Sequence, residues 1–111
     1  MVTVATLDIA PSLVPAAETV IIGPVPASHE FNFPVIRFVN TDTVDHQLTI
    51  WNKTSAAAGT DADLEQKSFT LFPGQMLEHG PVILAPGRRI SVMADVAGKI
   101  SCRPHGWDFG P

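Results

Sequence analysis

Two histidines and the single cysteine of this chain could together bind a metal ion. Cys102 and His105 are separated by two residues, and His46 follows an acidic turn earlier in the chain. A thiolate with two imidazoles suits copper, because soft sulfur and nitrogen donors favour that ion. The alternative is that Cys102 is a small core residue, as free cysteines usually are, and that both histidines are ordinary loop residues. Copper binding requires that the fold bring His46 to the other two residues.

The remaining polar residues lack the spacing of known catalytic motifs. His29-Glu30 and Glu78-His79 are adjacent pairs on segments with an extended pattern, and neighbours on a strand point to opposite faces. The loop aspartates do not have the spacing of a calcium loop, and we expect them to cap turns; they are Asp42, Asp45, Asp61 and Asp63. No nucleophile elbow, phosphate-binding loop or zinc-protease motif occurs. The sequence therefore predicts a protein that is not an enzyme and has no cofactor.

Proline and alternating apolar residues determine the elements that must position these side chains. Ten prolines are spread along the 111 residues, and each one opposes a helix. Leu48 and Ile50 alternate with polar neighbours, as do Ile90 and Val92, which is typical of half-buried strands. The expected strands are 2–9, 19–22, 35–39, 47–52, 67–72, 81–84, 89–94 and 99–102, with a short extended segment at 76–79.

These seven or eight short strands, separated by turn signals, predict an all-β protein with an immunoglobulin-like or jelly-roll-like β-sandwich. Only residues 61–66 could form a helical turn, and residues 55–63 are small and polar enough for an exposed loop. The inward positions of the strands give an expected core of Ile36, Phe38, Leu48, Ile50, Phe69, Leu71, Ile83, Ile90, Val92 and Ile100.

Composition narrows the range of partners. Seven basic and eleven acidic residues give a formal net charge of −4, so the domain has no broad positive field to attract nucleic acid. No apolar run approaches the roughly 20 residues of a membrane-spanning helix, and the N-terminus lacks the basic region of a signal peptide. Only 16% of the residues are charged, which is typical of a surface packed against other proteins. We expect neither a nucleic-acid nor a membrane partner.

The domain organisation suggests where such a protein partner would bind. Residues 1–111 are expected to form one sandwich, with an extended N-terminal segment at 1–18 and a short aromatic tail at 104–111. Aromatic residues are enriched at interface hot spots, and two pairs of them flank the predicted strands. These candidate interface residues are Phe31, Phe33, Trp107 and Phe109. The terminal pair either packs on its own sandwich or inserts into a neighbour.

The order of strands and turns resembles small structural proteins of tailed bacteriophages and prophages. A strand ending in Asn40-Thr41 leads to a second strand at 48–51 and a variable loop, followed by strands separated by the Pro73-Gly74 and Pro86-Gly87 turns. The resemblance covers about residues 35–103. It implies a β-sandwich on the virion, assembled in the host cytoplasm. The implied role is a capsid decoration protein bound to the major capsid protein, as a homo-oligomer on the particle, or a neck, tail or fibre component.

A second, weaker resemblance is to cupredoxins. The segment 38–47, which includes His46, looks like their first-ligand segment, and residues 101–105 look like their Cys-x-x-His loop. This resemblance implies a copper site of His46, Cys102 and His105. The sequence departs from the cupredoxin pattern after the second histidine, because residues 106–111 contain no methionine to serve as the usual axial ligand. A third alternative is a binding module for a sugar or a protein.

Overall fold

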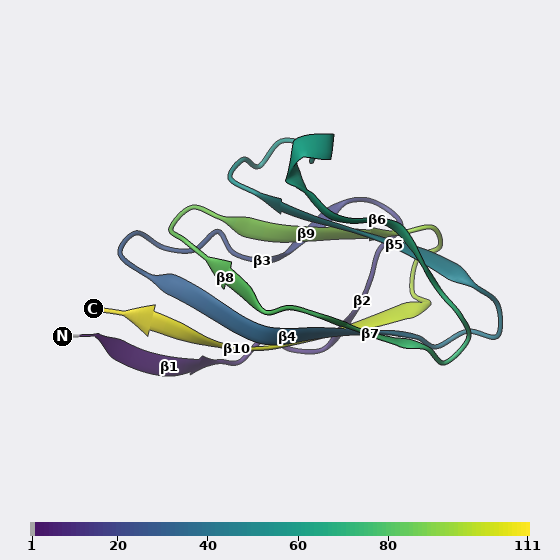
Figure 1. Cartoon of the computed structure of the whole chain (residues 1–111), viewed down its shortest axis with the longest axis horizontal. Helices are drawn as coiled ribbons and strands as arrows, with labels where there is room; N and C mark the ends of the chain where they lie inside the picture. The colour runs from purple at the N-terminus through teal and green to yellow at the C-terminus, as the bar shows by residue number, and fades with distance from the viewer. Residues whose placement is uncertain (1) are drawn as a thin grey trace.

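The computed structural model of this chain describes residues 2–111, and most of them lie in strands (Figure 1). Every strand pairing is antiparallel, which confirms the predicted all-β class. The described strands are β1 Thr3–Leu7, β2 Ser12–Leu13, β3 Thr19–Ile22, β4 Glu30–Asn40, β5 His46–Lys53, β6 Leu64–Leu71, β7 Met76–His79, β8 Val82–Leu84, β9 Arg89–Ala94 and β10 Ile100–Gly110. A single 3-10 turn, η1 Asp61–Asp63, precedes β6.

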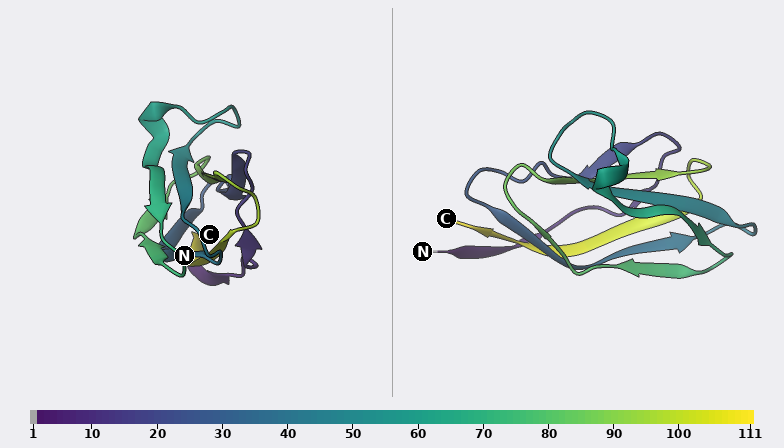
Figure 2. Two further views of the ribbon diagram at one scale, coloured as in Figure 1. Left: turned by 90° about the vertical axis from the view of Figure 1, so that its right-hand side faces the viewer. Right: turned by 45° about the horizontal axis from the view of Figure 1, so that its top comes forward.

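The strands form two sheets that pack face to face as a β-sandwich, as predicted (Figures 1 and 2). The larger sheet has the order β1-β10-β4-β7, with β2 also paired to β10 and β8 also paired to β4. The smaller sheet has the order β3-β9-β5-β6. On the side where β6 and β7 approach, Glu65 of the smaller sheet accepts a hydrogen bond from His79 of the larger sheet at 2.8 Å. This contact ties the two layers together.

Most of the predicted core residues are buried between the two sheets. The expected side chains Ile36, Phe38, Leu48, Ile50, Leu71, Ile90, Val92 and Ile100 are all fully buried. Phe69 is half-buried and packs against this cluster. Ile83 was assigned to the core wrongly: its neighbours Val82 and Leu84 point inward, so the alternation of β8 turns Ile83 to the solvent.

A β-bulge in the larger sheet explains why the core pattern shifts along β4. His105 lies opposite Val35 and Trp107 lies opposite Asn32, so Gly106 alone faces the two residues Phe33 and Pro34. The extra residue lets both Phe33 and Ile36 point inward although three positions separate them. A Cβ atom on Gly106 would lie 2.6 Å from the Asn32 carbonyl oxygen, so the close approach requires glycine.

Segments near the two ends of the chain form one pair of strands: β1 lies within the strand predicted at 2–9, whereas the tail predicted at 104–111 is largely a continuation of β10. Residues 3–7 of β1 pair with residues 110–106 of β10, and β4 flanks β10 on its other side. Residues 104–110 continue the strand although they begin with a proline. Pro104 lies between the part of β10 that pairs with β2 and the part that pairs with β1. In the described part of the chain no strand faces it on that side, so its missing N–H group removes no hydrogen bond between strands.

The loop between β5 and β6 covers the outer face of the smaller sheet (Figure 1). A Cβ atom on Gly59 would lie 2.4 Å from the Trp51 ring, so the loop backbone packs directly on this side chain. Trp51 and Lys53 are buried on the face that would otherwise be exposed. Among residues 2–111 no helix has the length and apolar character needed to cross a membrane.

Candidate functional site

The four candidate interface aromatics divide between the core and the surface. Phe31 and Phe33 are buried in the core, with their rings edge to face at a centroid distance of 6.3 Å, so the interface assignment is wrong for these two residues. They lie inside because β4 begins at Glu30 and turns both rings toward the smaller sheet. Trp107 and Phe109 alternate along β10 with the inward residues and lie on the outer face of the larger sheet.

Trp107 belongs to a group of apolar side chains on this outer face, which we call the outer apolar patch; it comprises Val4, Ile83, Trp107 and Phe109. Trp107 is 43% exposed, Val4 is 56% exposed and Ile83 is 59% exposed. Asn32 of β4 lies opposite Trp107 on one side and opposite Ile83 on the other, so these two side chains lie in one row across the sheet. Val4 lies directly opposite Phe109. Large apolar side chains gathered on one face indicate an interaction site more strongly than scattered ones.

Charged residues border the outer apolar patch along β10. Arg103 lies opposite Arg37 on β4, and Arg37 in turn faces Glu78 on β7, with 3.8 Å between their charged atoms. A shallow groove runs beside β10 from Arg103 to Trp107 and is closed on its other side by the connection between β1 and β2. His105 lines this groove and is exposed. The patch is therefore apolar at its centre with a polar border, which is the usual anatomy of a protein interface.

The three proposed copper ligands do not come together. Cys102 points into the core, His105 points outward from the same strand, and His46 lies in the smaller sheet. Within residues 2–111, no group of three histidine, cysteine or acidic side chains is placed to hold a metal ion. Burial raises the pKa of the Cys102 thiol to about 12, so the thiolate that a copper ligand or a nucleophile needs is disfavoured at neutral pH.

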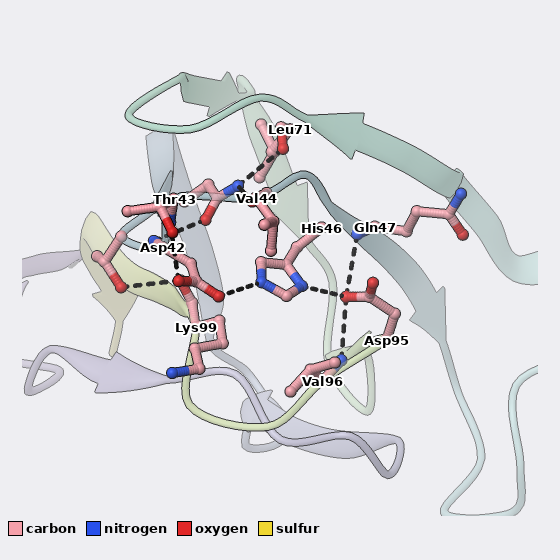
Figure 3. Close-up of polar contacts among 11 residues, drawn as sticks. Asp42, Thr43, Val44, His46, Gln47, Leu71, Asp95, Val96 and Lys99 are labelled. Carbon is pink, nitrogen blue, oxygen red and sulfur yellow. Dashed lines mark hydrogen bonds and ion pairs between the residues drawn. The ribbon is translucent and has the colours of Figure 1, made fainter.

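His46 instead lies between two carboxylates at one end of the sandwich (Figure 3). Its Nε2 atom is 2.8 Å from Asp42 Oδ2, and its Nδ1 atom is 3.0 Å from Asp95 Oδ1. Asp42 lies in the loop before β5 and Asp95 follows β9, so the ring joins two loops that are distant in sequence. The buried Asn40 amide supports the first loop by donating to the carbonyl oxygens of Val44 and Leu71, both at 2.8 Å.

The two carboxylates favour the charged form of the His46 ring. The hydrogen bond with Asp42 raises the pKa of His46 above its ordinary value of 6.5, and Asp95 adds to this effect. In return, the ring lowers the pKa of Asp42. Burial alone would raise the pKa of Asp95, but hydrogen bonds from the Gln47 backbone and the ring outweigh it and lower that pKa. The ring and the two carboxylates therefore each favour the charged form of the other.

This network can hold loops together but leaves His46 no free nitrogen. A histidine that binds a metal or accepts a proton needs a ring nitrogen with an available lone pair. Both ring nitrogens of His46 contact a carboxylate, and the side chain is only 5% exposed. The arrangement therefore indicates a structural tie at this end of the sandwich, close to the turn that the sequence places at 40–43.

A second buried polar cluster anchors the loop that covers the smaller sheet. The Lys53 ammonium, which is 4% exposed, donates to Glu18 Oε2 and, at 2.7 Å, to the Ala57 carbonyl oxygen. Glu18 also accepts hydrogen bonds from Ser91 Oγ at 2.7 Å and from the Gly59 N–H at 2.8 Å. The contacts to Ala57 and Gly59 hold the loop, and the Ser91 hydroxyl joins Glu18 to β9. No motif marks the cluster in the sequence, because its residues come from three distant segments.

No protein-family model, curated protein or solved structure matches this chain. Val4 and Ile83 were not predicted from the sequence as parts of the outer apolar patch, because their positions follow only once the strand register is known. With the register in hand, Val4 lies on the outer face opposite Phe109, and Ile83 lies between its buried neighbours Val82 and Leu84.

Proposed function

We propose that this chain is a non-catalytic structural protein of a tailed-phage virion that decorates the capsid by binding the major capsid protein. The alternative is that the chain is a component of the neck, tail or fibre, where it would bind its partner through the same surface. The proposal combines the resemblance of residues 35–103 to small phage structural proteins with the surface of the sandwich. Attachment to a particle requires a binding face and needs no reacting group.

The observation that carries this proposal is the difference between the two outer faces of the sandwich. The loop between β5 and β6 covers the smaller sheet and buries Trp51. The larger sheet has no such cover in the described residues, and it exposes Trp107 and Ile83 on strands that lie side by side with β4. Burying apolar area of this kind stabilises a complex by about 25 cal/mol per Å². The outer apolar patch is thus the face that gains most from a partner.

The first experiment asks whether the chain belongs to a particle at all. Tailed-phage particles would be purified from a lysate of cells that carry the gene, and they would be probed with an antibody against this chain. We expect the chain to copurify with the particles and the antibody to label the head at many positions. Labelling confined to the neck or tail would overturn capsid decoration and support the alternative location in the virion. Absence of the chain from the purified particles would overturn the proposal.

The second experiment tests the binding face on particles that lack the chain. Trp107→Ser removes the aromatic centre of the outer apolar patch, and we expect binding to weaken at least about tenfold, because truncated aromatic anchors often cost that much affinity. Phe72→Ser is the matched control, since Phe72 is an exposed aromatic side chain away from the patch. Equal affinities of the two variants, with both folded, would contradict the assignment of the patch.

A further inference from the structure

The free edges of the two sheets differ in how well they are protected against pairing with another strand. Natural proteins block such edges with charges, prolines, bulges or short strands. β6 carries Glu65 and Lys67 and has a left-handed residue, Ser68, with φ of 47°. β7 carries Glu78, and β3 has four residues and an irregular register. The two-residue β2 and the three-residue β8 are too short to offer a long edge.

β1 has none of these protections. Its sequence, Thr-Val-Ala-Thr-Leu, contains no charge and no proline, and its pairing with β10 is continuous without a bulge. Within residues 2–111, β10 is the only strand that pairs with β1, so the other side of β1 is free. Asp8 is the first charged residue after Thr3 and lies beyond the end of the strand.

The register indicates which backbone groups of β1 face outward. The Val14 N–H donates to the Ile100 carbonyl oxygen at 2.8 Å, so even-numbered residues of β10 direct their polar groups toward the β1 and β2 side. Asp108 is therefore hydrogen-bonded with its partner Ala5. By the same alternation, Val4 and Thr6 direct their N–H and C=O groups away from β10. These four groups have no strand to pair with in the described chain.

We infer that β1 is a dimerisation edge and that its partner is β1 of a second copy of this chain, paired antiparallel about a twofold axis at Ala5. In this register Val4 lies opposite Thr6 of the partner subunit and forms two hydrogen bonds with it, and the symmetric pair forms two more. The larger sheets of both copies then join into one continuous sheet. This inference goes beyond attachment to a capsid and does not depend on it.

Three features of β1 favour a second copy over another occupant. No charged residue lies between Thr3 and Leu7, so self-pairing brings no like charges together. Ala5 would meet Ala5 of the partner subunit at a non-hydrogen-bonded position, where the side chains come closest and a small residue fits. The outer apolar patches of the two copies would also become continuous, because Val4 faces Phe109 within each copy. A twofold contact of this kind closes on itself and ends at a dimer.

The mass of the isolated chain in solution tests this inference without any particle. We expect sedimentation between about 1 μM and 1 mM to show the mass approaching twice 11.9 kDa as concentration rises. Thr6→Pro removes one outward N–H and keeps the β1–β10 hydrogen bonds, so it should remain monomeric over this range. Thr6→Val keeps the N–H and should still form the dimer. A monomeric wild-type chain at the highest concentration would overturn the inference, as would a Thr6→Pro variant that dimerises like the wild type.

Cross-linking tests the register and does not rely on the proline variant folding. Ala5→Cys places two thiols opposite each other across the twofold axis, where the Cα separation suits a disulfide. Thr3→Cys is the matched control, because Thr3 would lie opposite Leu7 of the partner subunit. We expect mild oxidation to give a disulfide dimer of Ala5→Cys and little of Thr3→Cys. The buried thiol of Cys102 does not compete. Equal cross-linking of the two variants would contradict the register, and no cross-linking of Ala5→Cys would overturn the dimer.

Discussion

His46 illustrates how one residue can take different roles that the sequence alone does not separate. Its position after an acidic turn suits a metal ligand, but the same turn supplies Asp42 as a hydrogen-bond partner at 2.8 Å. Asp95 reaches the other ring nitrogen from the loop after β9. Two carboxylates around one buried imidazole stabilise its charged form, so the residue acts as a tie between loops.

The His46 network predicts a pH window for stability. The pKa of His46 is raised above 6.5, so its contribution to the free energy of unfolding is complete below that pH and is lost as pH rises through the raised value. The pKa values of Asp42 and Asp95 are lowered below 3.8, so their contributions are present above that pH and are lost as pH falls through the lowered values. The network therefore stabilises the fold most between these two limits.

The variant His46→Gln tests this window through unfolding by denaturant across the pH range. We expect the difference in unfolding free energy between wild type and variant to be largest from about pH 4 to 6.5 and to shrink as pH rises further. His105→Gln is the control, because it removes an exposed histidine outside the network. A difference for His46→Gln that grows with pH above neutrality would contradict the raised pKa.

Substitutions of Phe33 and Trp107 compare the energetic cost of removing an aromatic side chain from the core and from the outer apolar patch. Phe33 is fully buried, so Phe33→Ala should lower the free energy of unfolding by about 3–5 kcal/mol through lost transfer energy and a cavity. Trp107 is half-exposed in the isolated chain, and Trp107→Ala should cost clearly less. Chemical denaturation of both variants measures the contrast. A larger loss of unfolding free energy for Trp107→Ala than for Phe33→Ala would contradict the placement of Phe33 in the core and of Trp107 on the outer face.

At the scale of the element, the bulge between β4 and β10 decides which side chains enter the core. Gly106 fits opposite Phe33 and Pro34 only because it lacks a Cβ atom, which would lie 2.6 Å from both the Asn32 carbonyl oxygen and the Phe33 ring. The bulge also positions Trp107 on the outer face directly after it. The local geometry of one glycine is therefore linked to the exposure of the main aromatic residue of the patch.

Gly106→Ala should destabilise the protein by about 1–3 kcal/mol, because the added methyl group collides with backbone that cannot easily move. Ser101→Ala on the same strand is the control, since it changes a partly exposed position away from the bulge. Thermal and denaturant unfolding measure both changes. An unchanged stability of Gly106→Ala would show that the bulge relaxes freely, contrary to the close contacts found here.

At the scale of the whole molecule, the sandwich has one covered and one uncovered outer face. The buried pair of Lys53 and Glu18 fastens the covering loop on the smaller sheet, while the larger sheet leaves Trp107 and Ile83 at the surface. Only 16% of the residues are charged, so partners are expected to be held mainly by neutral contacts. Under the proposed function, this asymmetry would direct the larger sheet toward the partner.

Neutral contacts predict that attachment to particles depends only weakly on salt. Screening weakens charge–charge contacts over about 10 Å at 0.1 M salt, but it has little effect on buried apolar area. Binding of the labelled chain to particles, measured from low to physiological salt, should change little. A steep loss over this range would instead assign the binding energy to charged residues bordering the patch, such as Arg103 and Arg37.

The fold class could be predicted because its signals are local. Prolines exclude long helices, and alternation at Leu48 and Ile50 or at Ile90 and Val92 marks strands whatever their neighbours are. The predicted core failed at Ile83, where a three-residue strand offers too little alternation to determine its inward face. The candidate copper site failed to assemble because the distance between His46 and Cys102 depends on how the two sheets pack.

The sequence by itself therefore determined the all-β architecture, most of the core and the low charge of the surface, since each follows from residue type and short-range periodicity. Only the tertiary structure decided that Phe31 and Phe33 are internal, that residues 104–110 continue a central strand, and that β1 is an edge strand of the larger sheet. These features depend on register, on one bulge and on which strands become neighbours. Such pairings join residues about a hundred positions apart, and no local pattern encodes them.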